Sequence, residues 1–246
     1  MGRSIASSTD NNTADNSPTL AGTGTPGDTI TVYDGNTPLG TAVVDANGNW
    51  SLTAPVMSDG VHNISTTATD PAGNTSGRSP ALAVTIDTEG PSAPAADVAA
   101  LSDTGSSNTD NITSDNTPEI TGGGATPGDT ITLRDAAGNT LGTAVVAQDG
   151  SWAITPTSPL ADGTQNLSVT ATDSAGNTSP ATTVPVTIDT TAPAAPAATL
   201  ATASNSGLTT DNVTSDNTPT ITGTGATPGD TITLYAADGT TELGTA

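Results

Sequence analysis

The feature of this sequence that most limits its fold is internal repetition with a period of about 100 residues. The string D-N-S/T-P begins at Asp15, Asp115 and Asp216, which gives spacings of 100 and 101 residues. Four other landmarks recur in the same order: P-G-D-T at Pro26, Pro127 and Pro228, a tryptophan at Trp50 and Trp152, A-T-D-x-A-G-N-T-S at Ala68 and Ala171, and I-D-T at Ile86 and Ile188. Because order and spacing are kept, the 246 residues are predicted to form tandem modules rather than one large domain.

The landmarks divide the chain into three modules that differ in completeness. Residues 90–190, called module two, contain every landmark and are expected to form a complete module. Residues 1–89, module one, begin inside the equivalent of a loop of module two, so we expect module one to lack its first strand. Residues 191–246, module three, stop at the equivalent of Ala144, so we expect only the N-terminal part of a module, with open strand edges. The chain is therefore expected to be a segment of a longer repeat array.

Within each module, apolar residues alternate with polar ones, which is the period of half-buried β-strands. In module two the alternation predicts strands near residues 96–101, 118–123, 129–135, 140–146, 151–155, 164–172 and 182–189. Turn signals separate these runs, and Asp149-Gly150 before Trp152 suits a two-residue hairpin. Seven short strands per 100 residues predict an all-β fold of tandem immunoglobulin-like Greek-key β-sandwiches.

The composition limits both the core and the chemistry of the chain. The sequence has no Cys, no Phe, two Trp and one His, so thiol catalysis, zinc sites and large aromatic cores are not expected. We expect Trp152 to fill the core between the sheets, because Ile154 follows on the same face; the alternative is an exposed ring that stacks on a ligand. His62 has Gln165 at the matching position of module two and is expected to be a lone exposed strand residue.

Net charge excludes further classes of function. With 25 acidic and 3 basic residues, the formal charge is −22, so binding to nucleic acid or to an anionic membrane by electrostatics is not expected. No apolar window is long enough for membrane insertion. The G-x-G-x-x-G match at residues 22–27 precedes a β-rich run, and Ala125 and Ala226 break its spacing in the other modules, so we interpret it as a turn rather than a dinucleotide site.

Aspartate is far more frequent than glutamate, 22 residues against 3. Net negative charge alone does not explain this preference, because both side chains carry the same charge. Short carboxylates suit turns, where they accept hydrogen bonds from nearby N–H groups, and this role is expected for many of them. Others recur in clusters on loops and at strand ends of successive modules, as metal ligands would. The candidate metal ligands are Asp10, Asp15, Asp70, Asp87, Asp110, Asp115, Asp173, Asp189, Asp211 and Asp216.

The expected topology predicts which of these carboxylates can meet, since alternate loops of a Greek-key sandwich lie at the same end. At the junction of modules one and two we expect Asp87, Asp10 and Asp15 to face Asp173, Asp129 and Asp149. In module two, Asp110, Asp115 and Asp189 are expected at the opposite end, with Asp162 near them. Oxygen ligands without nitrogen or sulfur are those that Ca²⁺ prefers, so calcium is the predicted cofactor.

Several motifs together resemble a known family. Residues 110–118, the P-G-D-T turn, the D-G-S-W hairpin, A-T-D-S-A-G-N-T-S and I-D-T-T-A-P resemble the bacterial immunoglobulin-like repeats of giant cell-surface adhesins and biofilm-associated proteins of Gram-negative bacteria. The resemblance covers essentially the whole chain. It implies a secreted or surface-anchored rod stiffened by Ca²⁺, whose partners are neighbouring modules and, through domains outside this segment, a host-cell or surface ligand. Carried over by position, the calcium ligands are the acidic residues named above.

Three functions are open to a chain with these features. An extender segment of a repeat adhesin needs no ligand of its own and fits the recurring carboxylates. A glycan- or protein-binding module needs an exposed aromatic platform, for which only Tyr33 and Tyr235 are available. An enzyme is not expected, because glycoside hydrolysis needs paired acids in a cleft, whereas these acids recur at module ends; a spacer of a secreted multidomain enzyme remains an alternative. The sequence favours the extender.

Overall fold

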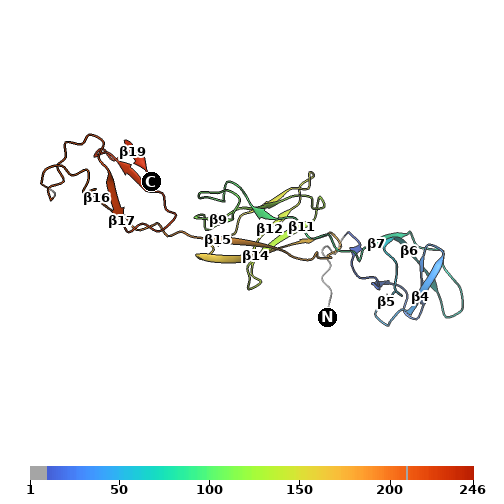
Figure 1. The fold of residues 1–246 in the computed structure, drawn as a ribbon. Coiled ribbons are helices and arrows are strands. Elements are labelled where there is room, and N and C mark those ends of the chain that lie inside the picture. The colour runs from blue at the N-terminus through green and yellow to red at the C-terminus, as the bar shows by residue number, and fades with distance from the viewer. Residues whose placement is uncertain (1–9, 209) are drawn as a thin grey trace. The chain divides into compact units, whose positions relative to one another are not determined.

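The computed structural model describes residues 10–208 and 210–246, and these residues form β-strands and no helix (Figure 1). The chain divides into two compact units, Met1–Asp189 and Thr190–Ala246, which are described separately. The all-β fold predicted from the alternating pattern is confirmed. Across the described ranges, no helix is long and apolar enough to cross a membrane.

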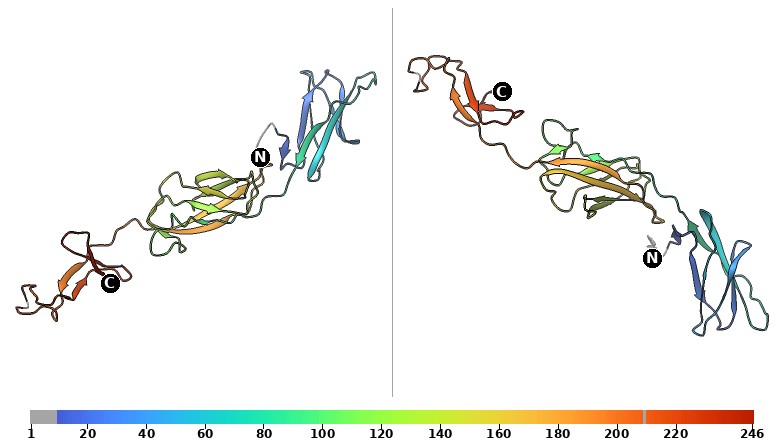
Figure 2. Two further views of the ribbon diagram at one scale, coloured as in Figure 1. Left: turned by 90° about the horizontal axis from the view of Figure 1, so that it is seen from above. Right: turned by 60° about the horizontal axis from the view of Figure 1, so that its bottom comes forward.

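Module two is a sandwich of two sheets, with strand orders β13-β10-β8 and β12-β11-β14-β15-β9 (Figure 2). Its strands are β8 (Asp97–Val98), β9 (Ile112–Thr113), β10 (Ile120–Gly122), β11 (Thr130–Arg134), β12 (Thr140–Val145), β13 (Trp152–Ile154), β14 (Gly163–Thr172) and β15 (Thr182–Ile188). Paired strands are antiparallel except β9 and β15, which are parallel. This arrangement is the predicted immunoglobulin-like sandwich.

The core of module two follows from the alternation along these strands. Buried side chains come from both sheets and form one cluster that includes Ile120, Leu133 and Val186. Trp152 is 5% exposed and belongs to this cluster, which confirms its predicted place between the sheets. Since aromatic residues are scarce, burial of aliphatic side chains at about 25 cal/mol per Å² supplies most of the apolar stabilisation.

The short strand β9 differs from the prediction, which treated residues 110–116 as a loop. The carboxylate of Asp110 accepts a hydrogen bond from the N–H of Ile112 at 3.1 Å, and Asn111 between them has a φ of 58°. These features turn the chain so that Ile112 and Thr113 run parallel to β15. Thr113 is 1% exposed, and its hydroxyl donates to the carbonyl of Ser102 at 2.5 Å. The loop is therefore anchored at its centre.

Module one repeats this arrangement with one strand fewer in its described part. Its sheets have the orders β1-β7-β6-β3-β4 and β2-β5. The strands are β1 (Asn12–Thr13), β2 (Thr19–Thr23), β3 (Thr29–Asp34), β4 (Thr37–Val43), β5 (Asn49–Thr53), β6 (Gly60–Thr69) and β7 (Leu82–Ile86). A separate apolar cluster, which includes Val32 and Ile86, forms its core. Within residues 10–89, no strand takes the place that β8 has in module two.

In its described residues, 190–208 and 210–246, the second unit has four strands in two two-stranded sheets, β16-β17 and β18-β19. They are β16 (Ala197–Leu200), β17 (Ile221–Thr224), β18 (Thr233–Tyr235) and β19 (Glu242–Thr245). Their apolar residues are poorly covered, and Leu243 is 61% exposed. That this unit is the N-terminal part of a third module stays a prediction, supported by the match of β16 and β17 to β8 and β10 in the repeat.

We expect Thr113→Val to lower the stability of module two by about 1–3 kcal/mol, because it leaves the partly buried carbonyl of Ser102 and the N–H of Asp115 without their hydroxyl partner. Thr143→Val, on the exposed side of β12, is the matched control and should change stability little. Urea unfolding followed by the fluorescence of Trp152 in a Trp50→Phe background measures both. Equal stability of the two variants would contradict the anchoring role of Thr113.

Candidate functional site

Most of the predicted metal ligands accept backbone hydrogen bonds within turns. Nine of the ten accept a hydrogen bond from a backbone N–H two to four residues downstream: Asp10, Asp15, Asp70, Asp87, Asp110, Asp115, Asp173, Asp211 and Asp216. The tenth, Asp189, follows β15 and donates its own N–H to the carbonyl of Thr113. Local turn chemistry therefore explains why aspartate, with its short side chain, outnumbers glutamate.

One turn, with the sequence D-x-A-G-N, recurs three times and is capped twice over. The aspartate accepts hydrogen bonds from both the backbone N–H and the side-chain amide of the asparagine four residues later. The pairs are Asp70 with Asn74, Asp135 with Asn139 and Asp173 with Asn177, at 2.8–2.9 Å. These hydrogen bonds hold the pKa of Asp70 and of Asp135 below the usual value for an aspartate.

The third of these turns lies at the junction of modules one and two, within the unit Met1–Asp189. The side-chain amide of Asn177 donates to the carboxylate of Asp173 at 2.9 Å and to the backbone carbonyl of Asp87 at 2.8 Å. The amide thus connects the two residues that the sequence predicted to share a cation. Asn177 itself was not predicted, although the D-x-A-G-N motif marks its position.

Two further hydrogen bonds join the same turn to the start of module one. The N–H of Ala14 donates to the carbonyl of Ala175 at 3.2 Å. The side-chain amide of Asn12 donates to the hydroxyl of Ser174 at 2.8 Å, and the buried side-chain oxygen of Asn12 has no partner. Residues 173–177 therefore touch both the beginning and the end of module one.

A second carboxylate lies beside this turn. Thr130 of β11 pairs with Thr172 of β14, so the neighbouring residues Asp129 and Asp173 approach each other at the end of the ladder. Asp129 is 5% exposed, and its Oδ2 atom has no hydrogen-bond partner. Burial, and secondly the negative charge of Asp173, raise the pKa of Asp129 above its ordinary value. The sequence placed Asp129 at this junction but did not include it among the ligands.

The donor atoms around this pair fit a hard cation. They are carboxylate oxygens, which Ca²⁺ prefers, and the Oδ2 atom of Asp129 is buried without a hydrogen-bond partner. Over residues 10–208 and 210–246, no three Asp, Glu, His or Cys side chains gather closely enough to hold a metal. A Ca²⁺ ion at Asp129 and Asp173 would therefore take its remaining ligands from amide, carbonyl or water oxygens.

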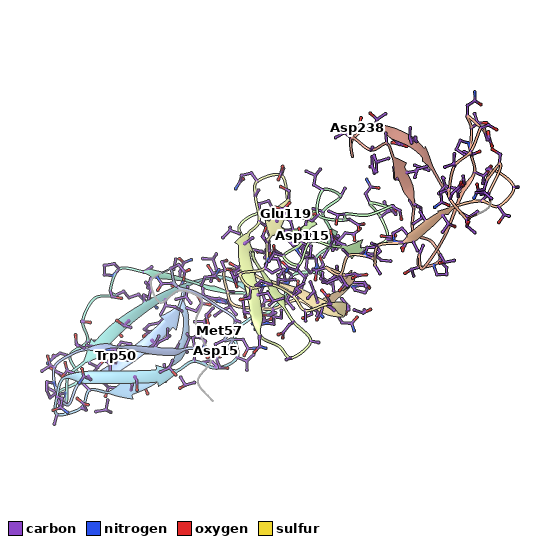
Figure 3. The ribbon with its side chains drawn as sticks, turned by 90° about the vertical axis from the view of Figure 1, so that its left-hand side faces the viewer. Asp15, Trp50, Met57, Asp115, Glu119 and Asp238 are labelled. Atoms are coloured by element: carbon purple, nitrogen blue, oxygen red, sulfur yellow. The ribbon has the colours of Figure 1, made fainter. Side chains whose placement is uncertain are left out.

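The other predicted ligands lie in four further places. In module one, Asp87 donates its N–H to the carbonyl of Thr13, so the end of β7 borders the loop of Asp10 and Asp15. Asp189 borders the equivalent loop of Asp110 and Asp115, and Figure 3 labels Asp15 and Asp115 in the two modules. Asp70 caps its own turn in module one. Asp211 and Asp216 belong to the unit Thr190–Ala246.

A second repeated feature was not predicted from the sequence. Asp103 and Asn205 occupy equivalent positions, since the N–H of each donates to the carbonyl of an alanine four residues earlier in equivalent loops. Both are buried, and the Oδ1 atom of each has no hydrogen-bond partner. Nothing in the alternating pattern marks these positions, because they lie in an irregular loop.

The expectation for His62 was wrong. The side chain is 13% exposed; its Nδ1 lies 2.7 Å from the carboxylate of Asp34 and its Nε2 lies 2.8 Å from the carbonyl of Ser58. Both partners only accept hydrogen bonds, so the protonated ring satisfies both contacts. The hydrogen bond with Asp34, and secondly that with Ser58, raise the pKa of His62. A strand position alone did not reveal that β3 and β6 bring these side chains together.

The aromatic platform needed for ligand stacking is partly covered. The guanidinium of Arg78 lies 3.8 Å from the ring centroid of Tyr33 and donates to the carbonyl of Gly35. One face of this ring is therefore occupied by a cation–π contact within module one. Tyr235, at the equivalent position in the other unit, is 51% exposed.

The sequence matches the profile of the bacterial Ig-like domain over residues 3–88 and again over residues 91–190. The chain belongs to the bacterial Ig-like domain family. Two such domains in tandem are structural modules rather than an enzyme. No curated protein gave a significant match to this bacterial Ig-like chain.

Solved structures similar to these bacterial Ig-like domains include a Ca²⁺-stabilized adhesin of an Antarctic bacterium that binds ice, at 28% identity and a TM-score of 0.39 over 77% of this chain and 48% of that one. A 1.5-MDa bacterial ice-binding adhesin matches at 28% identity and a TM-score of 0.36 over 71% and 58%. The BSP domain of a biofilm-associated protein matches at 24% identity and a TM-score of 0.29 over 73% and 29%. The chain thus spans less than two thirds of each.

We expect module one to lose stability as the pH rises through the elevated pKa of His62, because the protonated ring makes both hydrogen bonds in the folded state. The contribution is fully present below the unfolded-state pKa of about 6.5. His62→Gln keeps a donor for the carbonyl of Ser58, as Gln165 donates to the carbonyl of Ala161 in module two at 2.9 Å. Melting temperatures of the two proteins between about pH 5.5 and 9 test this. Parallel plots of melting temperature against pH for the two proteins would show that the pair of His62 and Asp34 does not titrate in this range.

Proposed function

We propose that this chain is a structural extender segment of a secreted or surface-anchored bacterial repeat adhesin, in which Ca²⁺ rigidifies the junctions between modules. The observation that supports this proposal most is the buried carboxylate of Asp129, which lacks a partner and lies beside Asp173 in the turn that contacts module one. Membership of the bacterial Ig-like family supports a structural role for the tandem modules. Such a segment belongs outside the cell, where calcium is abundant.

Electrostatics explains how a cation would act at this junction. Two nearby carboxylates, one of them buried, repel each other, and the sequence contains no Lys to neutralise them. A divalent ion at this pair removes the repulsion and restrains Asp173. Because Asn177 links Asp173 to the backbone of Asp87, restraint of Asp173 is passed to module one. Extracellular calcium modules bind with dissociation constants of about 10⁻⁴ to 10⁻³ M, which suits a ligand of the surrounding medium.

A ligand-binding role has less support. The ring of Tyr33 already stacks on Arg78, and module two has Arg134 at the equivalent position, so an aromatic surface is not repeated along the array. A segment that supports cell adhesion or biofilm formation through domains elsewhere in a longer protein needs no such surface. The alternative of a spacer in a secreted multidomain enzyme would use the same junctions in the same way.

Calcium is expected to raise the melting temperature of modules one and two by mass action. Asp129→Asn should abolish most of this response while leaving the calcium-free protein no less stable, because the unpartnered buried charge is removed. Asp149→Asn is the matched control, since Asp149 only caps an exposed turn through Ser151. Calorimetry with about 5 mM calcium, with chelator and with NaCl of equal ionic strength measures the effect. A rise in melting temperature of the same size in NaCl would show that the effect of calcium is charge screening.

Calcium is also expected to narrow the distribution of distances between modules one and two. The sequence has no Cys, so spin labels at Asn36→Cys and Ala161→Cys report on this junction without background. Double electron–electron resonance should give a narrower distribution in calcium than in chelator. Asn177→Ala should broaden it even in calcium, because the link from Asp173 to Asp87 is lost. Identical distributions with and without calcium would contradict the junction site, even if calcium bound elsewhere.

A further inference from the structure

Strand β4 forms one edge of the five-stranded sheet of module one (Figure 1). It pairs with β3, and no described strand pairs with its other side. In module two, β12 holds the equivalent edge. The sequence L-G-T-A-V-V is identical at the two edges, at residues 39–44 and 141–146. Free N–H and C=O groups along an edge strand are a template for pairing with another strand.

The hydrogen bond at the end of β4 shows which backbone groups point away from the sheet. The N–H of Val44 donates to the carbonyl of Asp28, just before β3, at 2.9 Å. Because the direction of backbone groups alternates along a strand, the N–H and C=O groups of Thr41 and Val43 point outward. The outward groups of β4 are therefore available to a strand laid beside it.

Module two covers part of the equivalent edge with its own chain. The backbone N–H and the hydroxyl of Thr157 both donate to the carbonyl of Leu141, at 2.8 and 3.0 Å. In module one this carbonyl belongs to Leu39, which has no partner in the register with β3 and, among the described residues, no hydrogen bond from the segment after β5. The connection that contains Thr157 is one residue longer, at residues 152–162, than its equivalent at residues 50–59. Module one therefore leaves open the edge that module two partly closes.

The side chains of β4 do not protect this edge. Val43 is 65% exposed, and Thr41 on the same face is exposed as well. Edge strands of natural proteins are commonly protected by charged side chains, and β4 has none. A strand added beside β4 covers part of Val43, so that apolar burial adds to the backbone hydrogen bonds.

Charge favours a second copy of the chain as the partner of this edge. Residues 35–44 contain no charged side chain, although the chain has a net charge of −22. A basic partner would be attracted to the acidic turns rather than to this uncharged strand. Two copies repel each other across most of their surfaces, and the repulsion is weakest where uncharged segments meet.

We propose that β4 pairs antiparallel with β4 of a second copy of this chain, which joins the two five-stranded sheets into one. The register that pairs all the outward-pointing residues places Thr41 opposite Thr41 of the second copy, and Val43 opposite its Leu39. The same surface is used by both copies, so association stops at a dimer. This contact is independent of calcium and goes beyond the proposed extender function, because it connects separate chains rather than successive modules.

The same register is compatible with the remaining residues of β4. Pro38 lies opposite Val44 of the second copy, whose N–H is already bonded to Asp28, so the missing N–H of proline costs no hydrogen bond. Asp45 lies opposite Thr37 of the second copy. No two carboxylates therefore face each other across the pair of strands.

Sedimentation velocity of the full chain in chelator, over a range of concentrations, tests the dimer. The wild type should pass from monomer to dimer as its concentration rises, and added NaCl should strengthen the dimer by screening the net charge. Val43→Lys should stay monomeric, because it places a charge on the paired edge of each copy. Val145→Lys is the matched control, since Val145 is 68% exposed at the equivalent position of β12 and the net charge changes equally. It should dimerise as the wild type does.

A single cysteine tests the register, because the sequence has no Cys of its own. Thr41→Cys should give a disulfide-linked dimer on oxidation, since the two copies of this residue face each other. Thr143→Cys, at the equivalent position of β12, should give far less. Both threonines are exposed, so their thiols are equally accessible to the oxidant.

Circular dichroism verifies that each variant stays folded, which is expected because all four substituted side chains are exposed. A wild type that stays monomeric at every concentration and salt, a dimer that persists in Val43→Lys, or equal loss of the dimer in both lysine variants would overturn the proposal. Equal cross-linking of the two cysteine variants would also overturn it. A monomer in which the amides of Thr41 and Val43 resist hydrogen exchange would overturn it too, and would assign this edge to another segment of the same chain.

Discussion

The hydrogen bond from a backbone N–H to an aspartate two to four residues upstream is the interaction on which the rest of this structure depends. The strands are short and the core has few aromatic side chains, so packing alone defines the register of each hairpin weakly. Capped turns such as Asp45 with Asn47 and Asn49, or Asp149 with Ser151, hold each connection in one conformation. Register follows from the turn, and burial of the alternating apolar residues follows from register.

This way of building turns has an electrostatic consequence. Each cap adds a negative charge, and because the sequence has three Arg and no Lys, the charges accumulate to −22. On exposed turns water screens them at little cost. At the junction of modules one and two, the turn-capping Asp173 lies beside Asp129, which is buried. Two carboxylates therefore lie close together where the two modules meet.

Equivalent side chains of modules one and two differ in how deeply they are buried. Trp152 is enclosed, whereas its equivalent, Trp50, lines an open groove. The cause is the first strand, since β8 closes one side of the sandwich in module two and no described strand does so in module one. The described sheets of module one are held by ladders that connect neighbouring strands of the same module.

The repeat, the β class, the sandwich and most strand positions followed from the sequence by itself, because alternation and turn residues act over a few neighbouring positions. The capping role of aspartate was predictable for the same reason. Tertiary structure alone decided that residues 112–113 form a strand, that His62 meets Asp34, that Asn177 joins Asp173 to Asp87, and that Asp129 is buried without a partner. These contacts join segments distant in the chain, and a local pattern does not encode which side chains the packing of two sheets, or of two modules, brings within hydrogen-bonding distance.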